Sequence, residues 1–450
     1  MLPNCATLRA EETTGFAMRV VIGAGADALR AAATLAVAGH AVLLLQESET
    51  PHGLDHPELP EGTGRISIPA ASRPAVEQVT GPLIDVPSVR RAVSHAGQFA
   101  ALPMGIGEVP KLFLSRELGG VGRQFLQQRV RNAMIPLTGG GQEERTYRQW
   151  VERRMGEAAY QSAYAHYAER RWGLPGDELS VAIARLHHNP HGNDGALVLA
   201  GDREAFFSHA VSLIEKNGGE VRCGASVRGF KVEDGRVVAV RVGRRNVPVD
   251  GPVWVARPHR VVAEWLGDAL YRGGHVDAAA LQTLDRVQVS FESPSGLNAD
   301  EIHILDRSAP AWRVSSVPGS PSTIVFHSNV APDQASPELN DFVALGVSLG
   351  LPGLDASRAQ VERLSDWAPV WAPVVHPRLR RLSLAFTEFG VVSVGRRGTF
   401  SPMGVGSEII LAARYAVDDE PDQREALRAL LAPPIKDDDL SASFRDFLWR

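Results

Sequence analysis

A short glycine-rich turn between two apolar runs constrains the fold more than any other feature of this sequence. Residues 19–22 form a mostly apolar run that ends at Gly23, and residues 41–45 form a second one. Between them, residues 29–38 are rich in alanine and leucine and predict a helix that ends at Gly39. Two buried strands joined by a helix within about 30 residues predict a βαβ unit with parallel strands.

The turn at residues 23–28 has the sequence GAGADA. Glycines at its first and third positions let the backbone approach a diphosphate, whose charge the N-terminus of the next helix stabilises. Ala28 stands at the sixth position, where a small residue permits close packing of the helix on the strand. The pattern predicts a dinucleotide-binding site at Gly23, Gly25 and Ala28, and a similar turn that binds nothing is the alternative.

Composition and charge restrict the function classes open to this chain. The chain has 450 residues, 44% of them hydrophobic, and a net charge of −5, which predicts roughly two or three domains. No basic stripe indicates nucleic-acid binding, and no run of about 18 apolar residues indicates a membrane span. With only Cys5 and Cys223, we expect no disulfide framework, an inert buried thiol at Cys223 and a cytoplasmic protein.

The later parts of the chain predict an antiparallel meander and further sheet structure. Strands over residues 226–233 and 236–242 flank Asp234-Gly235, a dipeptide typical of tight hairpin turns. Residues 253–256 predict a strand that returns to the parallel sheet, whereas residues 50–80 predict a loop. The other expected elements are helices over 146–171, 201–217 and 407–417, strands with one helix over 285–330 and 340–390, and a strand and loop over 391–396.

Three further segments carry a resemblance to a known family. Residues 147–156 have the sequence YRQWVERRMG, residues 164–173 have the sequence YAHYAERRWG, and residues 395–400 have the sequence GRRGTF. Together with the glycine turn, they make the chain from Met18 to Val417 resemble the flavoprotein superfamily of amine oxidases, protoporphyrinogen oxidases and UDP-galactopyranose mutases. In that superfamily the helical signature shapes the wall between two domains, and a Gly-Arg pair approaches the flavin.

The resemblance implies an α/β fold with a Rossmann-type FAD-binding domain and a discontinuous second α+β domain, which has a mixed or antiparallel sheet plus helices. It implies an FAD domain over residues 18–80, 195–260 and 390–420, a substrate domain over 81–194 and 261–389, an N-terminal tail over 1–17 and a helical tail over 421–450. The cofactor-binding residues that it implies are Gly23, Gly25, Ala28, Gln46, Glu47, Gly53, Val227, Gly395 and Arg396. It also implies Arg313 and Trp371 as cavity residues of the substrate domain, and it implies no general base.

Several positions depart from the superfamily pattern. Gln46 replaces the carboxylate that binds the ribose, His52 replaces one glycine of a pair, and Asp27 places a carboxylate where the diphosphate is expected. The flavin-contacting loop is not recognisable in residues 54–80, and residues 404–408 lack the acidic residue expected before the last helix. These departures favour a protein that keeps the fold with an altered cofactor site.

Two classes of function therefore remain open. The first is an FAD-dependent oxidoreductase of the amine oxidase or protoporphyrinogen oxidase type that acts on a small organic substrate, with a flavin-dependent sugar-nucleotide mutase as a variant. The second is a non-catalytic protein with a degenerate flavin site that binds or scaffolds a partner, another protein or a second copy of the chain. An NAD(P)-dependent reductase would use Gly23 and Gly25 but leaves the helical signature unexplained.

Other polar clusters carry weaker predictions. His187, His188 and His191 have metal-like spacing, but no cysteine or patterned carboxylate accompanies them, so we expect a polar loop and no metal site. The arginine pairs at residues 153–154 and 170–171 have the charge to attract an anionic substrate. Because long cationic side chains commonly extend from helix surfaces into water, we expect solvated helix faces at both pairs.

Overall fold

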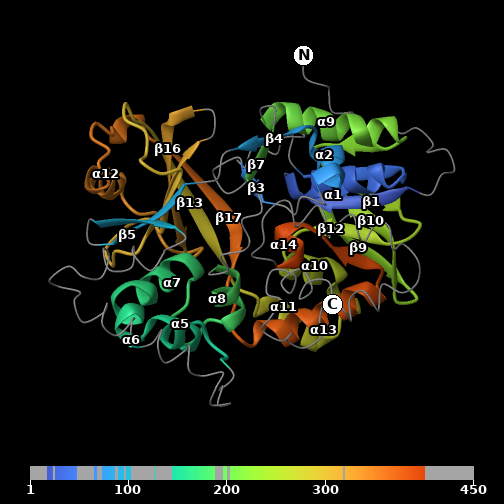
Figure 1. Ribbon diagram of the computed structural model, residues 1–450. Helices are drawn as coiled ribbons and strands as arrows, with labels where there is room; N and C mark the ends of the chain where they lie inside the picture. Colours follow the sequence, from blue (N-terminus) through green and yellow to red (C-terminus); the bar gives the residue numbers. More distant parts are fainter. Residues whose placement is uncertain are drawn as a thin grey trace. The chain divides into compact units, whose positions relative to one another are not determined.

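The computed structural model divides the chain into two compact units (Figure 1). The first unit consists of residues 1–87, 192–282 and 376–450, and the second consists of residues 88–191 and 283–375. The structure describes residues 18–23, 26–47, 65–67, 73–86, 90–95, 98–102, 127, 144–187, 196–199, 203–317 and 320–400. Each unit is therefore assembled from segments that are far apart in the sequence.

A five-stranded parallel sheet forms the centre of the first unit. Its strands lie in the order β18 (Val391–Ser393), β12 (Val253–Ala256), β1 (Arg19–Gly23), β2 (Val42–Gln46) and β8 (Glu220–Arg222). Every neighbouring pair is parallel. The three central strands are almost wholly buried, which explains why each is a continuous apolar run in the sequence.

Three helices contact one another over this sheet, namely α1 (Ala26–Val37), α2 (Arg73–Thr80) and α9 (Arg203–Lys216) (Figure 1). Leu29 and Leu35 of α1 join Phe207 of α9 and Trp254 of β12 in one apolar core. The alanines of α1 are buried in the same core, so the helix lies close to the strands that flank it in sequence. The expected βαβ unit is thereby confirmed.

Smaller elements complete the first unit. An antiparallel meander consists of β9 (Val227–Glu233), β10 (Arg236–Val242) and β11 (Arg245–Pro248). Its hairpin turn has φ values of 49° at Asp234 and 75° at Gly235, as the Asp-Gly sequence predicts for a tight turn. The remaining elements are β3 (Arg65–Ser67), β4 (Leu83–Val86), β7 (Ala196–Leu199), α10 (His259–Leu266), α11 (Arg272–Ala279), α13 (Val375–Glu388) and α14 (Gly395–Thr399).

The second unit is built on a seven-stranded sheet. Its strands lie in the order β17 (Gln360–Pro369), β13 (Thr283–Glu292), β16 (Ser320–Val330), β15 (Arg313–Val317), β14 (Glu301–Ile304), β5 (Arg91–His95) and β6 (Gln98–Leu102). All neighbours are antiparallel except β14 and β5. Apolar residues such as Val289 and Phe326 pack with Phe342 of α12 (Leu339–Ser348) in one core. The sheet is thus mixed, as expected for the second domain.

The long helix expected over residues 146–171 is broken in the structure. It consists of α5 (Tyr147–Met155), α6 (Glu157–Ala159), a π-helical turn (Tyr160–Tyr164) and α7 (Ala165–Trp172), and α8 (Val181–His187) follows. Gly156 has φ 93°, outside the range of a right-handed helix, and ends α5. An apolar pattern at helical spacing continues across such a break, so the sequence pattern conceals it.

The expected fold class is confirmed, and the structure differs from five local expectations. Residues 50–80 contain β3 and α2, residues 340–390 contain two helices, and residues after Ser393 form α14 where a loop is expected. The structure places residues 261–282 and 376–389 in the first unit, although we expected them in the second. Cys223 follows β8, is half-buried and is disulfide-bonded, so the expectation of an inert buried thiol is wrong. Cys5, the other cysteine, lies outside the described residues.

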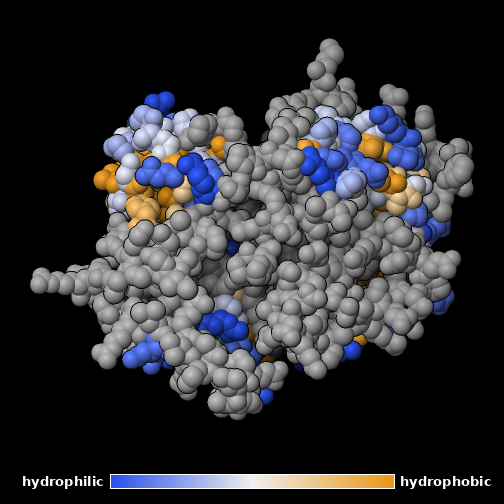
Figure 2. All heavy atoms as spheres, viewed as in Figure 1, coloured by the Kyte–Doolittle hydropathy of each residue, from blue (hydrophilic) through white to orange (hydrophobic). Residues whose placement is uncertain are grey.

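Large apolar side chains on the described surface come from separate elements, and Figure 2 shows apolar residues among hydrophilic ones on the viewed face. Single exposed apolar residues of this kind are ordinary in globular proteins. The exposed set consists of Val37, Phe99, Tyr271, Val276, Val347, Val361 and Val374. Within the described residues, no helix has the length and apolar character that crossing a membrane requires.

Candidate functional site

The carboxyl ends of the central parallel strands bring the sequence-predicted residues of the first unit to one edge. Gly23 ends β1, Gln46 ends β2 and Ala256 ends β12. Because these strands are parallel, the segments that follow them all leave the sheet at the same edge. Ligands of open α/β sheets bind at this edge, so it is the candidate cofactor site.

Backbone packing at this edge requires small residues. A Cβ atom at Gly23 would lie 2.7 Å from the Cβ of Ala28 and 3.0 Å from the Cβ of Ala256. Gly395 has φ 70°, and a Cβ atom there would lie 2.7 Å from the Cβ of Asp27. The first turn of α1 is therefore held between β1 and β12 on one side and the start of α14 on the other. The close helix–strand packing predicted from Gly23 and Ala28 is confirmed.

The carboxylate of Asp27 is neutralised inside the protein. Asp27 is 2% exposed and forms an ion pair with Arg30, which is 3% exposed and lies one turn further along α1. A buried carboxylate with such a partner repels a nearby diphosphate less than an isolated carboxylate does. The Asp27–Arg30 pair was not predicted, although its spacing of three residues is that of neighbours on a helix surface.

Gln46 and Glu47 occupy the place where the resemblance puts the ribose. Gln46 is fully buried, and its backbone carbonyl accepts a hydrogen bond of 2.9 Å from the N–H of Ala225. This bond brings the segment before β9 to the end of β2, two residues before the predicted adenine contact Val227. Amide groups such as that of Gln46 can donate to and accept from ribose hydroxyls.

An ion pair connects two strands at the same edge. The guanidinium of Arg257, directly after β12, lies 3.2 Å from the carboxylate of Glu47, directly after β2. Since β1 lies between β12 and β2, the pair spans the end of β1 next to Gly23. No pattern in the sequence indicated the role of Arg257, because its partner is 210 residues away along the chain.

Some predicted positions are not described at side-chain level. Gly25, Gly53 and His52 lie outside the described residues, as does the expected helix over 407–417. Arg396 belongs to α14, and its side chain is not described.

At the described positions, small residues, a neutralised carboxylate and a buried amide fit the diphosphate and ribose of a dinucleotide such as FAD. In the described part, no group of histidine, cysteine or carboxylate residues is arranged to hold a metal ion.

The two predicted cavity residues are both buried in the second unit. Arg313 of β15 is 2% exposed and forms an ion pair of 2.8 Å with Glu301 of β14. Trp371 follows β17, and its carbonyl accepts a hydrogen bond of 2.8 Å from the N–H of Ser180. The structure gives both residues packing partners, and their role at a cavity stays a prediction.

The seven-stranded sheet has a polar face that sequence reasoning missed. On β14 and β16, residues in the apolar core alternate with Glu301, His303 and His327. The hydroxyl of Ser315 lies 3.0 Å from Nε2 of His327. Burial and neighbouring arginines lower the pKa of His327 well below its usual value. Such alternation normally indicates a solvated face, but here several of the polar residues are buried and α7 contacts this sheet.

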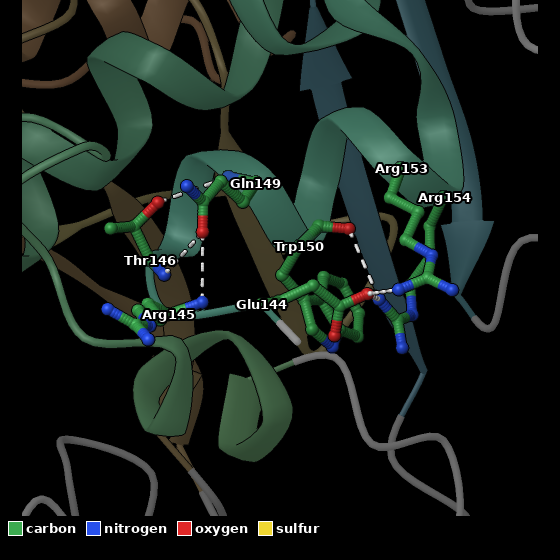
Figure 3. A network of polar contacts seen from close by, with 7 residues as sticks. All are labelled: Glu144, Arg145, Thr146, Gln149, Trp150, Arg153 and Arg154. Carbon is green, nitrogen blue, oxygen red and sulfur yellow. Dashed lines mark hydrogen bonds and ion pairs between the residues drawn. The ribbon is translucent and has the colours of Figure 1, made fainter. Parts of the chain in front are cut away.

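The helical signature of the second unit is held by a network around Glu144 (Figure 3). Glu144 is buried and lies 3.1 Å from Nη1 of Arg153 and 2.8 Å from Nη1 of Arg154. The guanidinium of Arg154 also lies over the ring of Trp150, 4.1 Å from its centroid. The expectation of a solvated face is therefore wrong for this pair, because a carboxylate nine residues upstream reaches both arginines.

The second arginine pair also points inward. Arg170 donates to the backbone carbonyls of Ile304, Asp306 and Arg307 after β14. Arg171 lies over the rings of Tyr167, Trp172 and Trp312. The expectation of solvated charge is wrong here too, since α7 packs on the sheet through these side chains.

Comparison with solved structures shows which fold these two units form. UDP-galactopyranose mutase in its reduced form matches with a TM-score of 0.68 and 13% identity over 90% of this chain and 95% of that chain. A putative protoporphyrinogen oxidase from Exiguobacterium sp. 255-15 matches with a TM-score of 0.63, 15% identity and coverage of 90% and 99%. Cyclohexylamine oxidase from Brevibacterium oxydans matches with a TM-score of 0.60, 12% identity and coverage of 90% and 98%.

The chain shares the fold of these three solved structures. The resemblance inferred from the glycine turn and the helical signature is thereby confirmed at the level of the fold. No protein-family model matches the sequence, and no curated protein matches it. Identities of 12–15% make the chain a divergent representative of this fold and leave activity to be argued from the site.

Proposed function

We propose that the first unit binds FAD and that the protein is an FAD-dependent oxidoreductase of the amine oxidase or protoporphyrinogen oxidase type. Its substrate is a small organic molecule. The observation that supports this proposal best is the close packing of Gly23 on Ala28 and of Gly395 on Asp27, which leaves no room for a side chain at either glycine. When bound, FAD would supply the chemistry, which is acceptance of a hydride from a C–H bond of the substrate as the adjoining C–N or C–C single bond loses a proton and becomes a double bond.

The residues of this chain hold and orient the cofactor. Gly23 and Ala28 keep the start of α1 close to the sheet, where its N–H groups would be available to the diphosphate. Arg30 balances the charge of Asp27 at the same helix end. Gln46 serves the ribose, and the resemblance assigns the adenine contact to Val227.

A titration of FAD into the purified protein tests this proposal. We expect binding to the unaltered protein and a loss of affinity of at least tenfold in Gly23→Val, because its Cβ lacks space against Ala28 and Ala256. Gly23→Ala adds the Cβ alone and should show a smaller loss. Circular dichroism establishes that each variant is folded. Equal affinity in all three proteins would show that FAD does not use this turn.

A sugar-nucleotide mutase is a second candidate within the same fold. UDP-galactopyranose mutase has a TM-score of 0.68, larger than the 0.63 and 0.60 of the two oxidases compared above. Incubating the FAD-loaded, reduced protein with UDP-galactopyranose, and the FAD-loaded, oxidised protein with an amine or a reduced tetrapyrrole, distinguishes the two activities. Ring contraction without net oxidation supports the mutase, and oxidation of an amine or a reduced tetrapyrrole supports the oxidoreductase.

A non-catalytic scaffold is the third candidate, and the Glu47–Arg257 ion pair favours it. This pair spans the end of β1, where a ligand of the sheet edge passes. If the Glu47–Arg257 pair stabilises the sheet edge in place of a cofactor, the protein should fail to bind FAD. In that case Glu47→Gln destabilises the first unit and creates no affinity for FAD.

A further inference from the structure

A polar cluster lies on the second unit, where α7 contacts the seven-stranded sheet. Arg171 of α7 and His303 of β14 are both half-buried, and Tyr167 is fully buried. Nη1 of Arg171 donates to the hydroxyl of Tyr167 at 2.5 Å, and this hydroxyl lies 2.8 Å from Nδ1 of His303. Because the Tyr167 hydroxyl accepts from Arg171, the proton of this hydroxyl is available to His303. The three side chains therefore form one hydrogen-bonded network.

Aromatic rings hold the guanidinium of Arg171 in place. Its central carbon lies 4.5 Å from the ring centroid of Trp312 and 4.6 Å from that of Trp172. Tyr167 and His303 contact the same Trp312, with ring centroids 6.4 Å and 6.2 Å away. A guanidinium over ring faces is stabilised by the ring quadrupole, and its in-plane N–H donors stay available to other partners.

The charge of Arg171 is not balanced by an ion pair within the described residues. Arg313, which lies over the same Trp312, pairs with Glu301 at 2.8 Å, and Arg153 and Arg154 share Glu144. The described contacts of the Arg171 guanidinium are the hydroxyl of Tyr167 and the three aromatic rings. A fixed guanidinium with donors remaining is the group that proteins use to bind carboxylates and phosphates.

We infer that Arg171 forms a binding site for an oxyanion, the carboxylate or phosphate of a small molecule. Arg171 contacts the anion, and Tyr167 and His303 position its guanidinium. The statement that this anion belongs to the substrate rests on the proposed function, because α7 belongs to the unit expected to carry the substrate. Binding itself does not depend on the flavin.

Calorimetric titration of the full chain with benzoate and with inorganic phosphate tests the site. We expect the unaltered protein to bind at least one of them, and Arg171→Gln to weaken that binding about tenfold or more. Arg171→Lys keeps the charge without the planar fork, so it should show an intermediate loss. Preference for benzoate assigns the site to carboxylates, and preference for phosphate assigns it to phosphates.

Arg148→Gln is the matched control. Arg148 also lies over a tyrosine ring, 5.4 Å from the centroid of Tyr160, but it pairs with Glu152 at 2.6 Å. We expect this variant to bind the anion with unchanged affinity. An equal loss in Arg148→Gln and Arg171→Gln would overturn the assignment, because it would mean that overall charge governs binding.

A double-mutant cycle tests the positioning role of Tyr167. Tyr167→Phe should weaken anion binding severalfold, and the double variant Tyr167→Phe/Arg171→Gln should bind no more weakly than Arg171→Gln alone. Additive losses would contradict this role.

Unchanged binding in Arg171→Gln, or no binding of either anion by the unaltered protein at millimolar concentration, would overturn the site. A parallel FAD titration keeps the tests separate, since anion binding without FAD binding refutes only the proposed function.

Discussion

His259 is a buried histidine that contacts two aromatic rings. It lies at the start of α10, is 2% exposed, and stacks on Phe386 with a centroid distance of 5.6 Å. The ring of Phe400 meets it edge-on at 6.5 Å. Burial lowers the pKa of His259 from 6.5 to about 4, because the protonated ring loses its hydration inside the protein.

This pKa predicts an acid-sensitive first unit. Below pH 6.5 the unfolded chain binds a proton at His259 that the folded chain does not bind until about pH 4, so stability falls as the pH falls through this window. Between pH 8 and pH 5 the loss is about 2 kcal/mol. His259→Phe should remove that part of the pH dependence, as measured by urea unfolding at both pH values. An unchanged pH dependence would show that His259 is protonated in the folded state.

At the scale of single residues, the sequence predicted contacts that depend on small size and missed those that depend on charge. Gly23 and Ala28 follow from the spacing of the glycine turn, since only small residues permit the helix to lie on the strand. The Glu47–Arg257 and Arg313–Glu301 pairs connect different strands, and a single sequence does not state which strands are neighbours. The buried His327 and the half-buried His303 were missed for the same reason.

The start of α5 depends on interactions that its own sequence supplies. Thr146 caps the helix by accepting from the N–H of Gln149, and the side chain of Gln149 accepts from the N–H of Thr146, so both residues satisfy helix-end groups (Figure 3). Glu144 adds the ion pairs to Arg153 and Arg154 at the other end of the helix. The capping box is visible in the sequence, whereas the reach of Glu144 is not.

Glu144→Gln should destabilise the second unit by about 1–2 kcal/mol, because a buried carboxylate that accepts from two guanidinium groups is lost. The control is Glu152→Gln, which removes a more exposed partner from Arg148 and should cost about 0.5 kcal/mol or less. Denaturant unfolding followed by tryptophan fluorescence measures both changes. A cost for Glu144→Gln no larger than that of the control would contradict a stabilising role for the network.

Helices and strands were predicted well where a single sequence pattern runs through the whole element. Parallel strands β1, β2 and β12 are short apolar runs, and the β9–β10 hairpin has an Asp-Gly turn, so both patterns were sufficient. The region from α5 to α7 was predicted as one helix because its buried tyrosines keep helical spacing through the π-helical turn. The break at Gly156 depends on a φ value that glycine permits but does not require.

At the scale of the whole molecule, two units with interleaved segments were inferred from the resemblance, and the fold matches solved structures at 12–15% identity. The structure places α10 and α11, and residues 376–388 of α13, in the first unit and not in the second, because the sequence of a helix does not state which sheet it packs on. Two features of the first unit have opposite implications for cofactor binding. The small residues at Gly23 and Gly395 favour a dinucleotide, whereas Gln46 and the Glu47–Arg257 pair replace the usual ribose carboxylate.

Binding of FAD decides between these implications. The measurement is an absorbance spectrum of the purified full chain before and after addition of excess FAD, with a thermal melt of each sample. The proposed function predicts the two visible absorbance bands of bound flavin and a melting temperature that FAD raises by several degrees, as mass action requires for a ligand of the folded state. A colourless protein whose melting temperature is unchanged by excess FAD would contradict the proposed function. The non-catalytic scaffold would then remain as the function of this chain.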